Sequence, residues 1–99
     1  MSVHNEEDFL EESITSILNQ SFTEFEFIIL EDGSTDSSSK IIDTYDDRRI
    51  MKMRNERNLG LTASLNKMVG TARGEYFCRH DGDDISLPTR LEEMNDFLK

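Results

Sequence analysis

The sequence predicts an α/β fold with three layers (α/β/α) built around a mostly parallel sheet. Two observations predict it. Segments whose apolar residues recur at helical spacing alternate along the chain with short runs of β-branched and aromatic residues. One such run, at residues 25–30, ends in four consecutive apolar residues, the pattern of a strand covered on both faces. Because strands separated by helices form right-handed crossovers, we expect the strands to be parallel.

The first elements follow from spacing and capping. A helix is expected over residues 6–20, with Asn5 as its N-cap and acidic residues in its first turn. Its apolar face consists of Leu10, Ile14, Ile17 and Leu18. The elements expected next are a strand at residues 25–30, a short helix around residues 41–45, a turn at residues 46–49 and a strand at residues 50–54.

The second half of the chain continues the alternation. The spacing predicts a helix over residues 61–72 that Gly74 closes, and then a strand at residues 76–79. Residues 86–89 open a last helix, with Pro88 in its first turn. The single Cys78 lies within the predicted strand, so we expect a buried core residue rather than a reactive thiol.

The chain is expected to be one partial domain over residues 1–99. A chain of 99 residues is too short for two separate hydrophobic cores. A doubly wound domain opens with a strand, yet only residues 1–3 precede the first helix, and no strand follows the last one. The pattern therefore predicts a Rossmann-like half-domain, truncated at both ends.

Charge restricts the partners of this chain. Its 21 acidic and 11 basic residues give a formal net charge of −10, which repels nucleic acid, so no nucleic-acid partner is expected. Acidic residues are ligands for hard divalent cations, and such a cation would screen the phosphates of a nucleotide. No segment approaches the ~18 apolar residues of a membrane span. We expect a cytoplasmic location, with membrane association left open for a longer protein.

Polar residues follow several predicted strands at the point where each strand ends. Asn5, Asp32 and the pair Asp81 and Asp83 all stand in such positions. Ligands of open α/β sheets bind beyond the carboxyl ends of the strands, so we expect these residues on one rim. With one glycine between them, the two carboxylates of the pair can point to one side and suit Mg²⁺ or Mn²⁺. A solvated acidic turn is the alternative.

Other sites are excluded or left open. An EF-hand fails because Ile85, Ser86 and Pro88 stand where its calcium loop needs a ligand, a glycine and an uninterrupted chain. Neither G-x-x-x-x-G-K-[ST] nor G-x-G-x-x-G occurs. His80 adjoins the acidic pair and is either a catalytic base, a metal ligand or, as we favour, a polar rim residue. The ring of His4 could offer a flat surface on which a base stacks.

The motifs taken together resemble the inverting family 2 glycosyltransferases of the GT-A fold. No single motif is specific, but their common order over nearly the whole chain makes chance agreement improbable. They are HNEE at 4–7, SILNQSF at 16–22, FEFIILEDGSTD at 25–36, RNERNLGL at 54–61, ARGEY at 72–76 and DGDDISLPTRL at 81–91.

This resemblance implies a donor-binding half-domain that takes a nucleotide-diphospho-sugar, with a UDP-sugar as the expected donor. Asp32 would accept a hydrogen bond from the N3–H of the base, and Ser2 and His4 would line the base pocket. Asp83 would bind Mn²⁺ or Mg²⁺ directly, with Asp81 nearer the sugar or ribose and also part of the metal site. The implied donor-binding set is Ser2, His4, Asn5, Asp32, Ser34 and Asp81.

The resemblance also has gaps. Glu31 stands where the family usually has Asp. The family's catalytic base and acceptor-binding half would lie outside this chain, so no catalytic residue is named and the acceptor, a sugar, lipid or protein, stays open. The alternative is a non-catalytic interaction or assembly module that retains the half-fold. Its exposed sheet edge, left by the short first strand, would pair with a second copy of the chain.

Overall fold

The computed structural model describes residues 1–74 and 76–98. Three strands pair in parallel into one sheet with the order β1-β2-β3, which confirms the predicted α/β class and parallel pairing. The elements are β1 (Ser2–Val3), α1 (Leu10–Leu18), β2 (Phe27–Asp32), α2 (Ser38–Asp43), β3 (Ile50–Asn55), α3 (Leu61–Thr71) and α4 (Arg90–Leu98).

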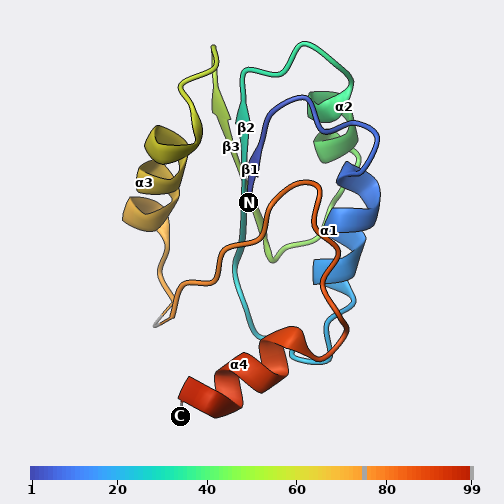
Figure 1. Ribbon diagram of the computed structural model, residues 1–99, viewed down its shortest axis with the longest axis vertical. Helices are drawn as coiled ribbons and strands as arrows, with labels where there is room; N and C mark the ends of the chain where they lie inside the picture. Colours follow the sequence, from blue (N-terminus) through green and yellow to red (C-terminus); the bar gives the residue numbers. More distant parts are fainter. Residues whose placement is uncertain (75, 99) are drawn as a thin grey trace.

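Helices cover both faces of the sheet, as the three-layer prediction requires. Helices α1 and α2 lie on one side and α3 on the other, while α4 lies at the end of the molecule away from the α2 end (Figure 1). Phe27 and Ile29 of β2 pack into the core beneath α1 and α2. Ile28 and Leu30 pack against Met68 of α3. The alternation of side chains along one strand therefore fills two cores, and every residue of β2 is buried.

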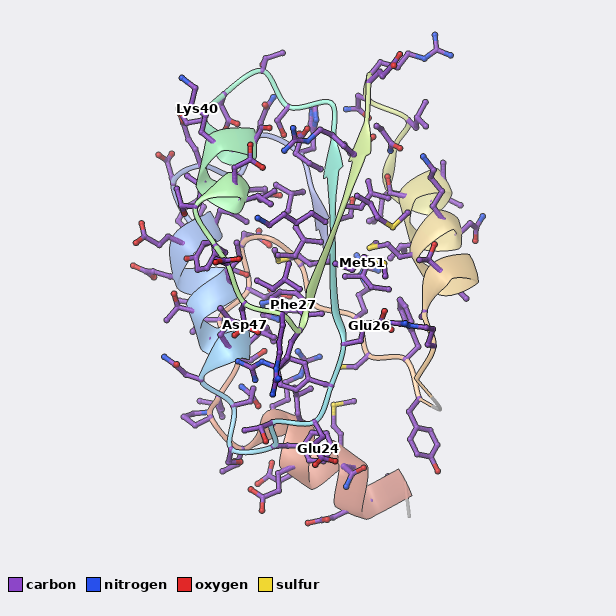
Figure 2. The ribbon with its side chains drawn as sticks, turned by 180° about the vertical axis from the view of Figure 1, so that it is seen from behind. Glu24, Glu26, Phe27, Lys40, Asp47 and Met51 are labelled. Carbon is purple, nitrogen blue, oxygen red and sulfur yellow. The ribbon has the colours of Figure 1, made fainter. Side chains whose placement is uncertain are left out.

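Figure 2 shows the same division from behind, with Phe27 on the α1 side of the sheet and Met51 of β3 on the α3 side. The register pairs Phe27 with Ile50 and Asp32 with Asn55. Val3 pairs with Glu31 in the same way. All three strands consequently end at one edge of the sheet, and the loops that follow them meet there.

Several element boundaries differ from the predictions. Helix α2 lies at Ser38–Asp43 rather than around residues 41–45, and α4 begins at Arg90, so Pro88 precedes it instead of lying in its first turn. Helix α1 begins at Leu10 rather than at residue 6, and Asn5 does not cap it. The Asn5 side chain instead accepts a hydrogen bond from the backbone N–H of Thr35, so the polar signal marked a contact between loops. The strand predicted at residues 25–30 lies at Phe27–Asp32, because its two acidic residues continue the pairing with β3.

The strand predicted at residues 76–79 is wrong. These residues form no strand, Tyr76 and Phe77 are exposed, and the thiol of Cys78 is exposed rather than buried in the core. Strand β1, at one side of the sheet, is two residues long, so it offers too short an edge for another strand to pair along. None of the helices in the described parts of the chain is long and apolar enough to cross a membrane.

The two-sided burial of β2 predicts a large effect of truncating its central side chain. Ile29 is fully buried, so Ile29→Ala should lower the free energy of unfolding by roughly 2–5 kcal/mol. Ile85, which is 66% exposed, gives a control with the same chemistry, and Ile85→Ala should stay within about 0.5 kcal/mol of the parent. Urea denaturation followed by circular dichroism measures both, and equal losses would contradict the assignment of β2 as the core strand.

Candidate functional site

The loops that follow β1 and β2 are tied together by hydrogen bonds at the carboxyl edge of the sheet. The backbone N–H of Asn5 donates to Ser34 Oγ at 3.0 Å, and Asn5 Oδ1 accepts from the N–H of Thr35 at 2.9 Å. Glu6 N–H donates to Ser38 Oγ at 2.9 Å. Asn5 adopts a φ of 52°, a left-handed conformation that asparagine tolerates better than most residues. The backbone of one loop is thereby held by side chains of the other.

A second set of bonds continues this contact toward α2. Asp36 accepts from the N–H of Glu7 at 3.2 Å and from the N–H of Ser38 at 2.9 Å. Glu7 in turn accepts from the N–H of Ser37 at 3.0 Å. Burial acts to raise the pKa of Asp36, but the hydrogen bonds from Ser38 and Glu7 outweigh it and lower that pKa. Asp36 therefore acts here as a charged acceptor for two loops.

Asp32, the last residue of β2, lies at the carboxyl edge of the sheet and accepts several hydrogen bonds there. Only 2% exposed, it accepts at Oδ1 from Asn55 Nδ2 at 2.9 Å and from the N–H of Leu59 at 2.8 Å. Its Oδ2 accepts from the N–H of Gly60 at 3.0 Å. Burial acts to raise the pKa of this carboxyl, but the three hydrogen bonds together lower it. Asp32 is therefore a buried carboxylate that holds the loop after β3 against the end of β2.

His4 is held between two of these loops. Its Nδ1 lies 2.8 Å from the backbone oxygen of Asp32, which can only accept, so Nδ1 carries the proton. Its Nε2 lies 3.0 Å from Nδ2 of Asn58, which donates to it. These contacts hold the ring in one orientation. The ring therefore forms a fixed wall at the edge of the sheet.

Gly33 allows the loops to approach this closely. It has a φ of +64°, and a Cβ built on it would lie 2.4 Å from backbone atoms of Arg57 and Asn58. No side chain fits at that distance, so glycine is required both for the conformation and for the contact. Glu31 Oε1 closes the turn by accepting from the N–H of Ser34 at 2.5 Å. The longer Glu side chain at this position thus has a structural use.

An acidic turn follows His80. Carboxylate oxygens of Asp81, Asp83 and Asp84 all lie within 4.8 Å of one another. Asp81 is also paired with Arg79 at 2.9 Å, while Asp83 and Asp84 are exposed. The turn closes through a bond from the N–H of Asp84 to the backbone oxygen of Asp81 at 3.0 Å. The donor set is made of hard oxygens and fits Mg²⁺ or Mn²⁺.

Glu6 contacts both this turn, through its side chain, and the loops at the carboxyl edge of the sheet, through its backbone N–H. Gly82 is buried against it, since a Cβ on Gly82 would lie 3.1 Å from Glu6 Cγ. Burial raises the pKa of Glu6, and the negative charges of Asp83 and Asp81 raise it further. The carboxyl groups of Glu6, Asp81 and Asp83 are therefore close enough for their charges to interact. Sequence reasoning missed Glu6 and Asp84, although Asp84 directly follows the predicted pair.

The structure brings five predicted residues to the ends of β1 and β2: Ser2, His4, Asn5, Asp32 and Ser34. Asp81 and Asp83 lie in the turn beside Glu6.

The prediction of His80 as a polar rim residue is wrong. His80 is 5% exposed and lies between Ser13 Oγ at 2.8 Å and Ser86 Oγ at 3.0 Å. Hydroxyl groups offered by α1 and by the segment before α4 allow this ring to be buried, which the neighbouring sequence does not reveal.

Comparisons with known proteins give matches over the whole chain. A family model described as "Glycosyl transferase family 2" matches residues 1–99. The chain is 46% identical to an uncharacterized glycosyltransferase of Methanocaldococcus jannaschii and 43% identical to the putative glycosyltransferase EpsE of Bacillus subtilis. It is covered completely in both alignments but spans only 36% and 37% of these relatives.

Solved structures give the same result. Crystal structures of S. aureus TarS 1–349 in complex with UDP and with UDP-GlcNAc match with TM-scores of 0.90 and 0.91. The sequence identity is 27%, and the matches cover 98% of this chain but only 30% and 29% of those chains.

The close approach at Gly33 predicts the result of a paired substitution. Gly33→Ala introduces backbone strain of about 1–3 kcal/mol and also a clash with residues 57 and 58. Gly60→Ala is the control for positive φ without a clash: Gly60 has a φ of +91° and a ψ of 164°, which strain an alanine at least as much, but no atom lies within 4 Å of the built Cβ. Gly33→Ala should therefore lower the free energy of unfolding clearly more than Gly60→Ala in urea titrations. Equal losses would show that the contact is not tight.

The lowered pKa of Asp32 predicts a pH dependence. A carboxyl with a lower pKa in the folded state stabilises the fold above its unfolded pKa, and this contribution is lost as the pH falls. The difference in unfolding free energy between the parent and Asp32→Asn should therefore be largest near neutral pH. It should shrink as the pH falls from about 4 through the lowered folded pKa. Denaturation curves at several pH values measure it, and a constant difference would exclude a charged, stabilising Asp32.

Proposed function

Because the chain belongs to glycosyl transferase family 2, we propose that it is the donor-binding portion of an enzyme that transfers a sugar from a nucleotide-diphospho-sugar. We propose a UDP-sugar as donor, inversion at the transferred carbon, and dependence on a divalent cation. One observation carries the proposal: Glu6 places the acidic turn beside the edge where β1 and β2 end. A ligand with a base at one end and a diphosphate at the other matches this arrangement.

The edge of the sheet supports a base pocket. Among the residues that the structure describes, Asp32 Oδ2 has a single protein donor, Gly60, and a carboxylate oxygen can accept two hydrogen bonds. It can therefore also accept from the N3–H of uracil. His4 presents a ring whose orientation is fixed, and Ser2 lies on the strand that leads to it. The presence of UDP in the matched TarS structure supports uracil as the base.

The acidic turn supports a metal and diphosphate site. Asp83 is the proposed direct ligand of Mn²⁺ or Mg²⁺, and Asp84 supplies a second exposed carboxylate. Asp81, partly neutralised by Arg79, is proposed to lie nearer the ribose or sugar and to complete the donor set. When bound, the cation would stabilise the charge that develops on the departing nucleoside diphosphate. Asn5 and Ser34 hold the loop between the base and the turn.

We further propose that residues 1–99 form a partial domain, with the acceptor-binding half and the catalytic base in a longer protein. The chain spans 36% of the length of a 46% identical relative, which supports this division. The acceptor is a sugar, a lipid or a protein. Turnover by the 99 residues alone is expected to be absent or weak even where the donor binds.

An assembly module is the second candidate function, and exposed apolar side chains favour it. Leu87, which precedes α4, is 76% exposed, and Phe97, in the last turn of α4, is 89% exposed. Such side chains are often covered by a partner. A second copy of the chain, joined here or along the free edge of β1, is the proposed partner in this case.

Calorimetric titration of UDP with Mn²⁺ separates the two functions. The parent chain should bind, and Asp83→Ala should weaken binding by at least roughly 10-fold, the loss typical even of residues that only support a metal ligand. Asp46→Ala is the control, since it removes an exposed carboxylate from the loop before β3, at the opposite edge of the sheet, and should leave binding unchanged.

The outcomes are distinct. Folded protein that does not bind UDP and Mn²⁺, or that binds equally well after Asp83→Ala, would overturn donor binding. If that protein is also a monodisperse dimer in light scattering, the assembly module becomes the better explanation. A monomer that binds would remove the support for that second candidate.

A further inference from the structure

The acidic turn is attached to α1 by a row of polar contacts. Ser13 and Ser16 of α1 and Gln20, which lies just beyond the C-cap Asn19, recur at helical spacing, and each bonds to the segment that carries the turn. Gln20 donates to the backbone oxygen of Leu87 at 2.7 Å and accepts from the N–H of Leu91 at 3.0 Å. We call these contacts the α1 seam.

Ser13 occupies the position in the seam nearest the turn. It is fully buried, and its Oγ lies 3.0 Å from the backbone oxygen of Asp81 and 2.8 Å from Nε2 of His80. Because the Asp81 carbonyl can only accept, the hydroxyl proton of Ser13 points to it. His80 must then donate from Nε2 to Ser13. The Asp81 backbone is thus tied to a buried serine on the helix.

The donor and acceptor roles of Ser13 and His80 also fix those of the next contacts, so that all of them form one chain of hydrogen bonds. With its proton on Nε2, His80 accepts at Nδ1 from the hydroxyl of Ser86 at 3.0 Å. Ser86 Oγ in turn accepts from Arg90 at 3.0 Å, and Arg90 also donates to the backbone oxygen of Arg79 at 2.9 Å. Each of these contacts has one donor and one acceptor in a single arrangement of protons. Fully satisfied polar networks of this kind hold one geometry.

Apolar packing offers this segment little alternative support. Ile85 and Leu87, which follow the turn, are 66% and 76% exposed. The turn itself is polar, and its one buried residue is Gly82. Its position relative to the sheet therefore depends on polar contacts: the α1 seam, the bonds that Ser21 donates to Pro88 and Glu92, and the contact with Glu6.

We infer that Ser13 and His80 are positioning residues for the acidic turn: they orient Asp81 and Asp83 toward the metal and diphosphate without touching either ligand. This inference rests on the proposed function of the turn. It adds a role for residues of α1 and for a histidine that neither binds the donor nor acts as a base.

The test compares Ser13→Ala with Ile17→Val. Both variants remove one small group from α1, but Ile17 lies on its apolar face in the core and takes no part in the seam. In Ser13→Ala, ¹⁵N relaxation should show increased mobility of the amides of Gly82, Asp83 and Asp84, and the ring nitrogen shifts of His80 should change. Affinity for Mn²⁺ with UDP should fall roughly 10-fold. Ile17→Val should leave all three readouts at parent values.

A second variant covers the case in which Ser13→Ala does not fold. Ser86→Ala opens the same chain of hydrogen bonds beyond His80 and should alter the His80 ring shifts and the amide mobility of the turn in the same direction. Turn amides that stay as ordered as in the parent, or that loosen equally in Ile17→Val, would overturn the inference. If the parent does not bind Mn²⁺ and UDP, the proposed function fails, while the relaxation measurements still decide whether the seam positions the turn.

Discussion

The site depends on one constraint, the burial of β2 on both faces. The side chains of β2 pack into two cores, and its pairing with β3 runs from Phe27 to Asp32. The last residue, Asp32, is therefore placed within the protein rather than at its surface. A carboxylate in that position needs donors. It obtains them from Asn55 and from the backbone at residues 59 and 60, which brings the loop after β3 over the end of the sheet. Hydrophobic packing thus sets the position of a polar group, and that group organises the edge.

The second half of the site is built differently. The acidic turn has little apolar anchorage and is held by directional bonds from α1 and by contact with Glu6. Such bonds contribute modestly to stability, because folding exchanges them for bonds to water. They define orientation well, however, which is what an arrangement of oxygen ligands requires. A rigid edge for a base and a hydrogen-bonded turn for a metal are consistent with the two ends of a nucleotide-diphospho-sugar.

Elements whose side chains are buried periodically could be predicted from the amino-acid sequence. The apolar run that became β2 and the helical spacing in α1 and α3 reflect side chains that face a core, so these elements and their parallel order were predictable. The strand predicted at residues 76–79 does not form. An apolar run indicates which side chains could be buried, but not whether the sheet offers an edge long enough for pairing. The predictions for Cys78 and His80 are wrong for related reasons. Cys78 is exposed because the strand that would have buried it does not form, and His80 is buried because hydroxyl groups of distant segments bond to its ring.

The sequence by itself therefore determined the α/β class, the order of β1, β2 and β3 along the chain, and the positions of Asn5 and Asp32 at the ends of the first two strands, but not those of Asp81 and Asp83, which follow no strand. Those properties follow from local spacing and from the direction of parallel strands. The tertiary structure alone decided that Asn5 joins two loops instead of capping a helix, that Glu6 lies under the acidic turn, and that Ser13 and His80 hold it. These contacts join residues up to 76 positions apart, from Glu6 to Gly82, and no local pattern encodes such a meeting.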